Sequence, residues 1–110
     1  MVQRGSLLDA SGASADRETV DLLLELPGAR IERIVSTGQA TPPGRWYDQA
    51  GDEWVALLAG RATLRLEDRG LVELAPGDWL LLPARLRHRV EATSADPPCV
   101  WLAVHVGPLP

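Results

Sequence analysis

The chain has 110 residues, a length that suits one domain, and its 45% hydrophobic and 24% charged residues are typical of a globular protein with a buried core. The formal net charge of −4 argues against a nucleic-acid partner, and because all eleven cationic side chains are arginines, a lysine Schiff-base mechanism is excluded. The single cysteine, Cys99, excludes an intrachain disulfide, and we expect it to be a small buried residue on a strand.

The N-terminal segment is small and polar. Residues 1–15 are rich in Ser, Gly and Ala, so we expect a flexible arm that precedes a single domain spanning residues 16–110. The stretch from Asp16 to Gly28 has two readings, either a short helix that Asp16 caps and Pro27 and Gly28 end, or an edge strand. No run of residues is apolar enough for a secretory signal or a membrane span, which predicts a cytoplasmic protein with no membrane partner.

From Arg30 onward, short apolar runs alternate with Gly, Pro and Asp. The runs are RIERIVS, EWVALLAG, RATLRLED, LVELAPG, DWLLLPA, LRHRVEAT and CVWLAVHV. They leave no room for long crossover helices, so they predict an antiparallel sheet closed into a barrel or sandwich. Residues 68–70 predict a hairpin, and residues 75–78 predict a tight turn in which Gly77 takes a positive φ.

Alternation along the strands assigns side chains to faces. Glu53 is in phase with Val55 and Leu57, and His88 is in phase with Val90, so both ionisable groups point with the apolar set. A carboxylate placed there needs a cation, a hydrogen-bond donor or water. We therefore expect the side chains of Glu53 and His88 to meet inside one cup.

Two other polar features have plainer readings. Arg85, Arg87 and Arg89 share the face opposite His88, which predicts a solvated or interface surface where they pair with acidic residues of the neighbouring strand. His105 lies on the last strand, where a histidine satisfied by a neighbour is the simpler expectation than an extra ligand or base.

Two spacings carry a family resemblance. Glu53 is followed by six residues and then Gly60, and Gly77 is followed by five residues, Pro83 and, five positions later, His88. These match the end of the first cupin motif, G-x5-H-x-H-x3-4-E-x6-G, and most of the second, G-x5-P-x-G-x2-H-x3-N. The chain thus resembles the small single-domain bacterial members of the cupin superfamily. The resemblance implies an all-β fold, the cupin double-stranded β-helix or jelly-roll barrel.

The first motif departs from the family pattern at its two histidines. Counting three residues back from Glu53, the family's histidine positions hold Tyr47 and Gln49, and counting four, they hold Trp46 and Asp48. Both registers remain open, and neither supplies an imidazole.

The second motif also departs, with Arg85 in place of its glycine and Ala92 in place of its asparagine. Of the family's three-histidine, one-glutamate ligand set, only Glu53 and His88 are kept.

The resemblance implies a partly degenerate site for a divalent ion such as zinc, iron, manganese or nickel. Gln49, Glu53 and His88 are the expected metal ligands, with Asp48 as a competitor, and Tyr47, Glu53 and His88 are the expected catalytic groups. The first reading is a weak metal-binding cupin that acts as a dioxygenase, isomerase or hydrolase on a polar small metabolite. Because a carboxylate and an imidazole beneath a phenol also suit acid–base work, metal is not required for chemistry.

Two further readings belong to other classes. The first is a non-catalytic cupin that binds or senses a small molecule without metal, and the second is a structural or oligomerising domain whose pocket an aromatic side chain fills. The resemblance also implies a homodimer, in which an exchanged N-terminal strand would cover a sheet edge.

Overall fold

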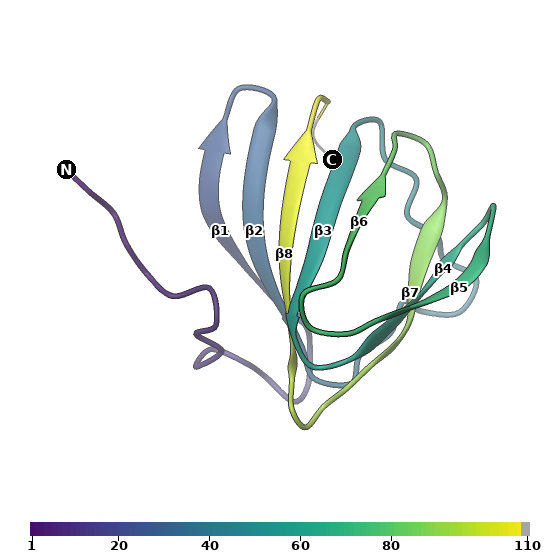
Figure 1. Ribbon diagram of the computed structural model, residues 1–110, viewed down its shortest axis with the longest axis horizontal. Coiled ribbons are helices and arrows are strands. Elements are labelled where there is room, and N and C mark those ends of the chain that lie inside the picture. The colour runs from purple at the N-terminus through teal and green to yellow at the C-terminus, as the bar shows by residue number, and fades with distance from the viewer. Residues whose placement is uncertain (109–110) are drawn as a thin grey trace.

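The computed structural model describes residues 1–108, which form eight strands in two antiparallel sheets and contain no helix (Figure 1). The strands are β1 (Thr19–Leu26), β2 (Ala29–Ser36), β3 (Asp52–Ala59), β4 (Ala62–Leu66), β5 (Gly70–Leu74), β6 (Trp79–Leu82), β7 (His88–Thr93) and β8 (Cys99–Val106). The larger sheet has the order β1-β2-β8-β3-β6, and the smaller has the order β5-β4-β7. The described part of the chain holds no helix of membrane-crossing length and apolarity.

The segment whose type was left open is an edge strand, and the helical reading is wrong. β1 pairs with β2 along its whole length, and Pro27 and Gly28 form the hairpin turn between them, with Gly28 at φ 75°. Pairing with β2 satisfies the backbone of a segment too short to gain much as an isolated helix. The preceding arm reaches the sheet, since Arg33 and Thr37 donate to the backbone carbonyls of Ser6 and Ser14. That the arm is mobile stays a prediction.

The core lies between the two sheets, as the alternation predicted. Leu57 on β3 is fully buried beside its register partner Trp101 on β8, where Cys99 is also buried. Leu64 and Leu66 on β4 join the same core from the smaller sheet. Each such apolar side chain contributes about 1.5–3 kcal/mol when taken out of water. This packing fixes which face of every strand points inward, and therefore where the ionisable residues in phase with it must lie.

The backbone conformation explains why two motif positions are glycine. Gly60 lies at φ 82°, and a Cβ there would come 2.7 Å from the carbonyl oxygen of Pro98. Gly77 lies at φ 96° in the turn where the amide of Asp78 donates to Ala75 O. The motif spacing therefore reflects turns that only a few residue types can make.

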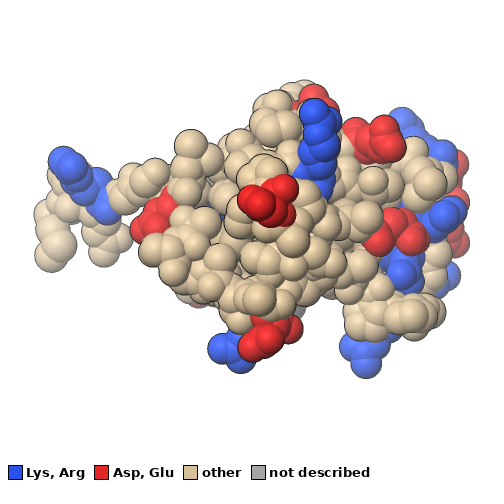
Figure 2. All heavy atoms as spheres, turned by 90° about the horizontal axis from the view of Figure 1, so that it is seen from below, with Lys and Arg blue, Asp and Glu red and all other residues tan. Residues whose placement is uncertain are grey.

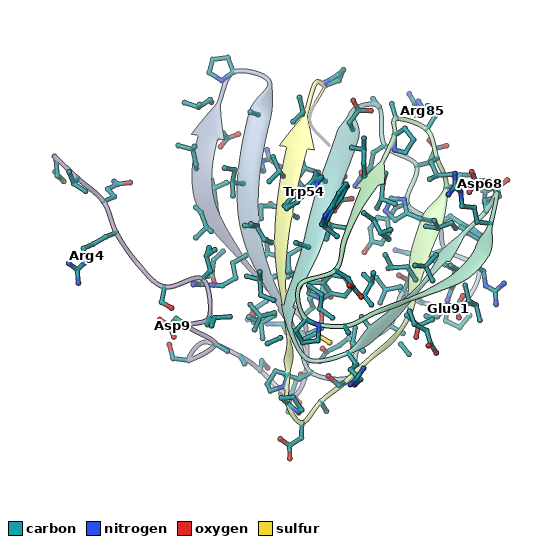
Figure 3. All side chains as sticks on the ribbon, viewed as in Figure 1. Arg4, Asp9, Trp54, Asp68, Arg85 and Glu91 are labelled. Carbon is teal, nitrogen blue, oxygen red and sulfur yellow. The ribbon has the colours of Figure 1, made fainter. Side chains whose placement is uncertain are left out.

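One end of the barrel is where the site residues gather. β1, β6 and β8 finish at the end that is uppermost in Figure 1, and β2, β3 and β7 begin there. Figure 3 places Arg85 at this end, and Asp68 and Glu91 on the side of the smaller sheet. Figure 2 shows blue and red side chains interspersed on that side and a largely uncharged surface elsewhere on the face it presents.

Candidate functional site

A row of side chains crosses the larger sheet at the open end of the barrel. Arg30 on β2 is opposite His105 on β8, which is opposite Glu53 on β3, which is opposite Leu82 on β6. Glu53 and His105 are 8% and 7% exposed, so both ionisable groups are buried at the end of the apolar core. The sequence predicted the inward placement of Glu53, and register alone brings the others beside it.

His88 enters from the smaller sheet and meets Glu53. It is the first residue of β7, is 5% exposed, and exchanges two backbone hydrogen bonds with Tyr47, of 2.7 and 3.1 Å. Its Nε2 lies 3.6 Å from Oε1 of Glu53. The predicted meeting of these two groups in one cup is confirmed, whereas their chemical roles stay predictions.

The contacts of the His88 ring determine what it offers to Glu53. Nδ1 lies 3.1 Å from the carbonyl oxygen of Leu86, and because a carbonyl only accepts, Nδ1 carries the proton of the neutral ring. Nε2 then presents a lone pair to a carboxylate that has only lone pairs. Two acceptors facing each other in a buried space need a cation, a proton or a water molecule between them.

Tyr47 covers the imidazole from the mouth side. Its ring stacks on the ring of His88 with centroids 5.4 Å apart and planes 28° from parallel. Burial raises the pKa of the Tyr47 hydroxyl, the charges of Glu18 and Glu53 raise it further, and a hydrogen bond with Thr41 acts in the opposite direction. At neutral pH the phenol therefore keeps its proton and can donate it.

The two candidates for a third ligand have different surroundings. Gln49 and Asp48 both line the hollow that holds Glu53 and His88, and no ion pair within the described residues involves Gln49. Asp48 lies at the rim, where its carboxylate is 3.3 Å from Nη1 of Arg85 in an exposed ion pair. Gln49 is thus the more available donor.

Arg85 occupies the turn where the family has glycine, and it has taken the glycine's conformation. Its φ is 68°, in the left-handed region, and its amide donates to the carbonyl of Gln49 at 2.7 Å. The turn is retained although the residue type is not.

Arg85 and Arg87 are exposed and ion-paired, as predicted, whereas the side chain of Arg89 is only 13% exposed and pairs with an acid of its own strand. Arg87 lies 3.2 Å from Glu67 and Arg89 lies 2.9 Å from Glu91. Arg87 also lies 5.1 Å over the ring of Trp46. These arginines hold strands and loops together and do not line the hollow.

Sequence reasoning missed several residues of the mouth. The hollow has a volume of about 470 Å³, and besides the predicted residues it is lined by Arg30, Glu32, Ile34 and His105. His105 is satisfied by a neighbour, as expected, because its Nε2 is 3.0 Å from Oε1 of Glu32. Arg30 and Glu32 alternate in phase with Ile34, and that alternation was the signal that could have found them.

The metal implied by the family can be tested against the donors present. Within residues 1–108, no three His, Cys, Asp or Glu side chains cluster closely enough to hold an ion. The 3.6 Å between Glu53 and His88 suits two ligands of one tetrahedral ion, whose ligand atoms at about 2.0–2.2 Å lie roughly 3.3–3.6 Å apart. With the amide oxygen of Gln49 the set fits a weak site of two strong donors and one poor one.

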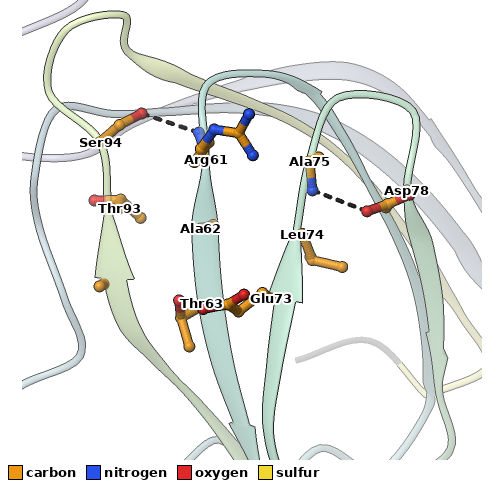
Figure 4. Close-up of a pocket in the computed structure, with 10 residues that line it drawn as sticks. Arg61, Ala62, Thr63, Glu73, Leu74, Ala75, Asp78, Thr93 and Ser94 are labelled. Carbon is orange, nitrogen blue, oxygen red and sulfur yellow. Dashed lines mark hydrogen bonds between the residues drawn. The ribbon is translucent and has the colours of Figure 1, made fainter.

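A second hollow lies at the opposite end of the barrel and has a volume of about 520 Å³ (Figure 4). Its polar groups already serve turns. Oδ2 of Asp78 accepts from the amide of Ala75 at 2.9 Å, and Oγ of Ser94 accepts from the amide of Arg61 at 3.0 Å. No histidine or cysteine lines it, so the mouth is the candidate site.

Fold and geometry together define a small jelly-roll barrel with a buried carboxylate–imidazole pair at its open end. The sequence profile of the family described as "Cupin domain" matches residues 33–105, which is most of the chain. The protein belongs to the cupin family. Among curated proteins, no sequence matches it.

Solved structures agree with this assignment. A Ralstonia eutropha protein that carries the provisional name mannose-6-phosphate isomerase is 46% identical, with a TM-score of 0.91 over 96% of this chain and 99% of that one. A cupin superfamily protein from Desulfitobacterium hafniense is 21% identical, with a TM-score of 0.77 over 96% and 93% of the two chains. An RmlC-like cupin from Desulfovibrio desulfuricans is 19% identical, with a TM-score of 0.74 over 98% of each chain. The last two show the fold alone.

Proposed function

We propose that this cupin binds a polar small molecule in its mouth and transfers a proton on it through Glu53 and His88. Tyr47 is the proton donor above the pair, and Gln49 completes a weak divalent-ion site with it. The observation that carries the proposal is the buried 3.6 Å approach of Oε1 of Glu53 to Nε2 of His88, which leaves two acceptors in need of a cation, a proton or a water molecule.

The pair and the phenol suit general acid–base chemistry. A carboxylate takes a proton from a bound molecule, while the neighbouring imidazole or the protonated Tyr47 returns one to an adjacent atom. The apolar core below Glu53 and the ring of Tyr47 above His88 limit the access of water to the pair. A divalent ion held there would polarise an oxygen of the bound molecule.

One relative supports the class of reaction. The similar Ralstonia protein is provisionally named an isomerase of a phosphorylated sugar. Conversion between an aldose and a ketose moves a proton between neighbouring carbons, which is work for a base and an acid held on one substrate. We therefore favour isomerase-type proton transfer on a hydroxy-carbonyl compound over the dioxygenase and hydrolase readings.

Two measurements test the proposal. Elemental analysis of freshly purified protein is expected to find a divalent metal that Glu53→Ala and His88→Ala remove and that Glu73→Ala, an exposed control on β5, retains. Hydroxy-aldehydes incubated with the protein in deuterated water are expected to gain deuterium at the carbon beside the carbonyl, as read by NMR. Wild-type protein with neither metal nor exchange would contradict the proposal.

The second reading is a non-catalytic binding or sensing cupin. It is favoured by the lack of any cluster of three His, Cys, Asp or Glu side chains that could hold a metal in residues 1–108. Under this reading a metabolite raises the melting temperature while chelators leave it unchanged, and no deuterium is exchanged.

We also propose that two copies pair through the outer face of the larger sheet, which is mostly apolar apart from the Arg33–Asp21 ion pair. Trp79 and Leu81 on β6 are 59% and 58% exposed there, and Trp79 stacks on Trp54 at 5.9 Å. By strand phase the face continues across Leu24, Leu26, Ile31, Leu102, Val104 and Val106. Four strands of eight residues and β6, of four residues, present roughly 570 Å² before side-chain relief is counted, compared with the roughly 800 Å² per partner of a standard-size interface.

We place the dimer contact on this outer face and not on an exchanged N-terminal strand. β1 already pairs with β2 of its own chain, so no strand from a partner is needed to cover the edge of β2. Sedimentation of wild-type protein is expected to show a dimer that Leu81→Arg dissociates. Leu71→Arg, at a residue 57% exposed on the other sheet, is expected to leave it intact. A wild-type monomer at high concentration would refute the pairing.

A further inference from the structure

A second, smaller space borders the mouth, lined by residues of both sheets. This inner space has a volume of about 60 Å³ and is lined mainly by apolar side chains: Ile34, Val55, Leu64, Leu82, Val90 and Trp101. It shares Ile34, Glu53 and His88 with the mouth. Glu53 and His88 therefore lie at the boundary between a polar outer space and an apolar inner one.

The charged side chains of the mouth differ in how they are paired. Glu32 lies 3.0 Å from His105 and Glu53 lies 3.6 Å from His88, so both carboxylates have imidazole partners within the hollow. Arg30 is the one arginine that lines it, and its only ion-pair partner among residues 1–108 is Glu25, 3.2 Å from Nη2 and half-exposed on the neighbouring strand.

The guanidinium of Arg30 has donors to spare. Its Nε is shielded from solvent and has no hydrogen-bond partner within the described residues. Arg30 and Glu53 are two strands apart in one row, roughly 10 Å between Cα atoms, and His105 lies between them. An anionic group between Arg30 and Glu53 would lie over His105 and meet the one arginine of the mouth, whose only ion-pair partner among the described residues is the half-exposed Glu25.

The geometry points to a short-chain carboxylate as the ligand class, with its anionic group at Arg30 and two to four aliphatic carbons reaching past Ile34, beside Glu53 and His88, into the inner space. About 60 Å³ admits roughly four water-sized groups, which sets the limit on chain length. Glu18 borders the inner space, but its carboxylate accepts from Oγ of Ser36 at 2.7 Å and is thus already partnered. The inference rests on the proposed function only in placing the ligand beside Glu53 and His88.

Chain length and charge test the inference in full-length protein. Dissociation constants of acetate, butyrate, hexanoate, octanoate and the neutral isostere butyramide are measured by NMR titration at fixed ionic strength. Affinity is expected to rise about fourfold per methylene as far as butyrate or hexanoate and then to fall. Butyramide is expected to bind at least tenfold more weakly than butyrate. Equal affinities along the series, or equal binding of butyramide, would overturn the inference.

The chain offers a matched control for the cation. Arg30 and Arg33 lie on the same strand and each pairs with an acid of β1, but Arg33 is on the opposite face. Arg30→Gln is expected to weaken butyrate at least tenfold, Arg30→Lys to weaken it less, and Arg33→Gln to change it less than twofold. Equal losses in Arg30→Gln and Arg33→Gln would refute the role of Arg30.

These outcomes separate this inference from the proposed function. Butyrate binding is read without metal or turnover, so a protein that exchanges deuterium but ignores butyrate refutes only the ligand class. A protein that binds butyrate through Arg30 but holds no metal and exchanges no proton refutes only the chemistry.

Discussion

The Glu53–His88 pair predicts an unequal pattern of stabilities. The side chains of Glu53 and His88 are 11% and 6% exposed, and their Oε1 and Nε2 atoms are 3.6 Å apart. His88→Leu leaves a buried carboxylate unpaired and is expected to lower the free energy of unfolding by about 3–5 kcal/mol. Glu53→Leu leaves only an imidazole nitrogen unpartnered and is expected to cost about 1–3 kcal/mol.

The double variant decides the interpretation. Replacing both groups by leucine removes the desolvation cost together with the attraction, so the double variant is expected to lie within about 1 kcal/mol of wild type. Urea unfolding with unchanged m-values measures the cycle. The exposed pair Glu67–Arg87, 3.2 Å apart, is the control, and its coupling is expected to stay below about 1 kcal/mol. Additive losses at positions 53 and 88 would refute a pair retained for function.

Three further predictions concern single groups. Tyr47 is the only tyrosine, so absorbance at 295 nm follows its ionisation alone. The midpoint of that titration is expected above the ordinary tyrosine pKa of about 10. Ionisation of Tyr47 lowers the stability of the fold at alkaline pH, and this loss is expected to be absent in Tyr47→Phe. A hydrogen bond from Arg65 lowers the pKa of Glu91 in the folded protein. Wild type is therefore expected to melt at a higher temperature than Glu91→Gln above the ordinary glutamate pKa, and to lose this advantage as the pH falls through the pKa of folded Glu91. A difference in melting temperature that does not depend on pH would contradict this. Arg85→Gly is expected to raise the free energy of unfolding by about 0.5–1 kcal/mol in urea, because relief of a left-handed arginine outweighs the added chain entropy, whereas Arg87→Gly is expected to lower it.

The fold could be predicted from sequence because periodicity and turn chemistry agree along most of the chain. The alternation of Ala62, Leu64 and Leu66 and the turn glycine Gly77 each specify one local structure, and the motif spacing orders them. The first strand was harder, because its apolar side chains occupy both faces around the bulge between Leu22 and Leu24. Neither a period of two nor a period of 3.6 describes such a segment.

Only part of the site could be predicted from the sequence, because the rest depends on how the strands are paired. Alternation says that Glu53 and His88 point inward, but it cannot say which residues stand beside them on neighbouring strands. Arg30 and His105 are 75 positions apart in the chain and opposite each other in the sheet. Pairing of that kind is set by the packing of whole strands, so a single sequence carries no local signal for it.

Strand pairing also explains how the mouth is built without the two histidines of the family's first motif. Where the family's first motif supplies two imidazoles, this chain has Tyr47 stacked on His88 and Gln49 at the wall. Its other histidine, His105, comes instead from β8 and is held by Glu32 beside Arg30. In place of the two motif imidazoles, the mouth therefore has a hydrogen-bonded imidazole, His105, next to the guanidinium of Arg30. That exchange favours recognition of an anion over tight coordination of a metal.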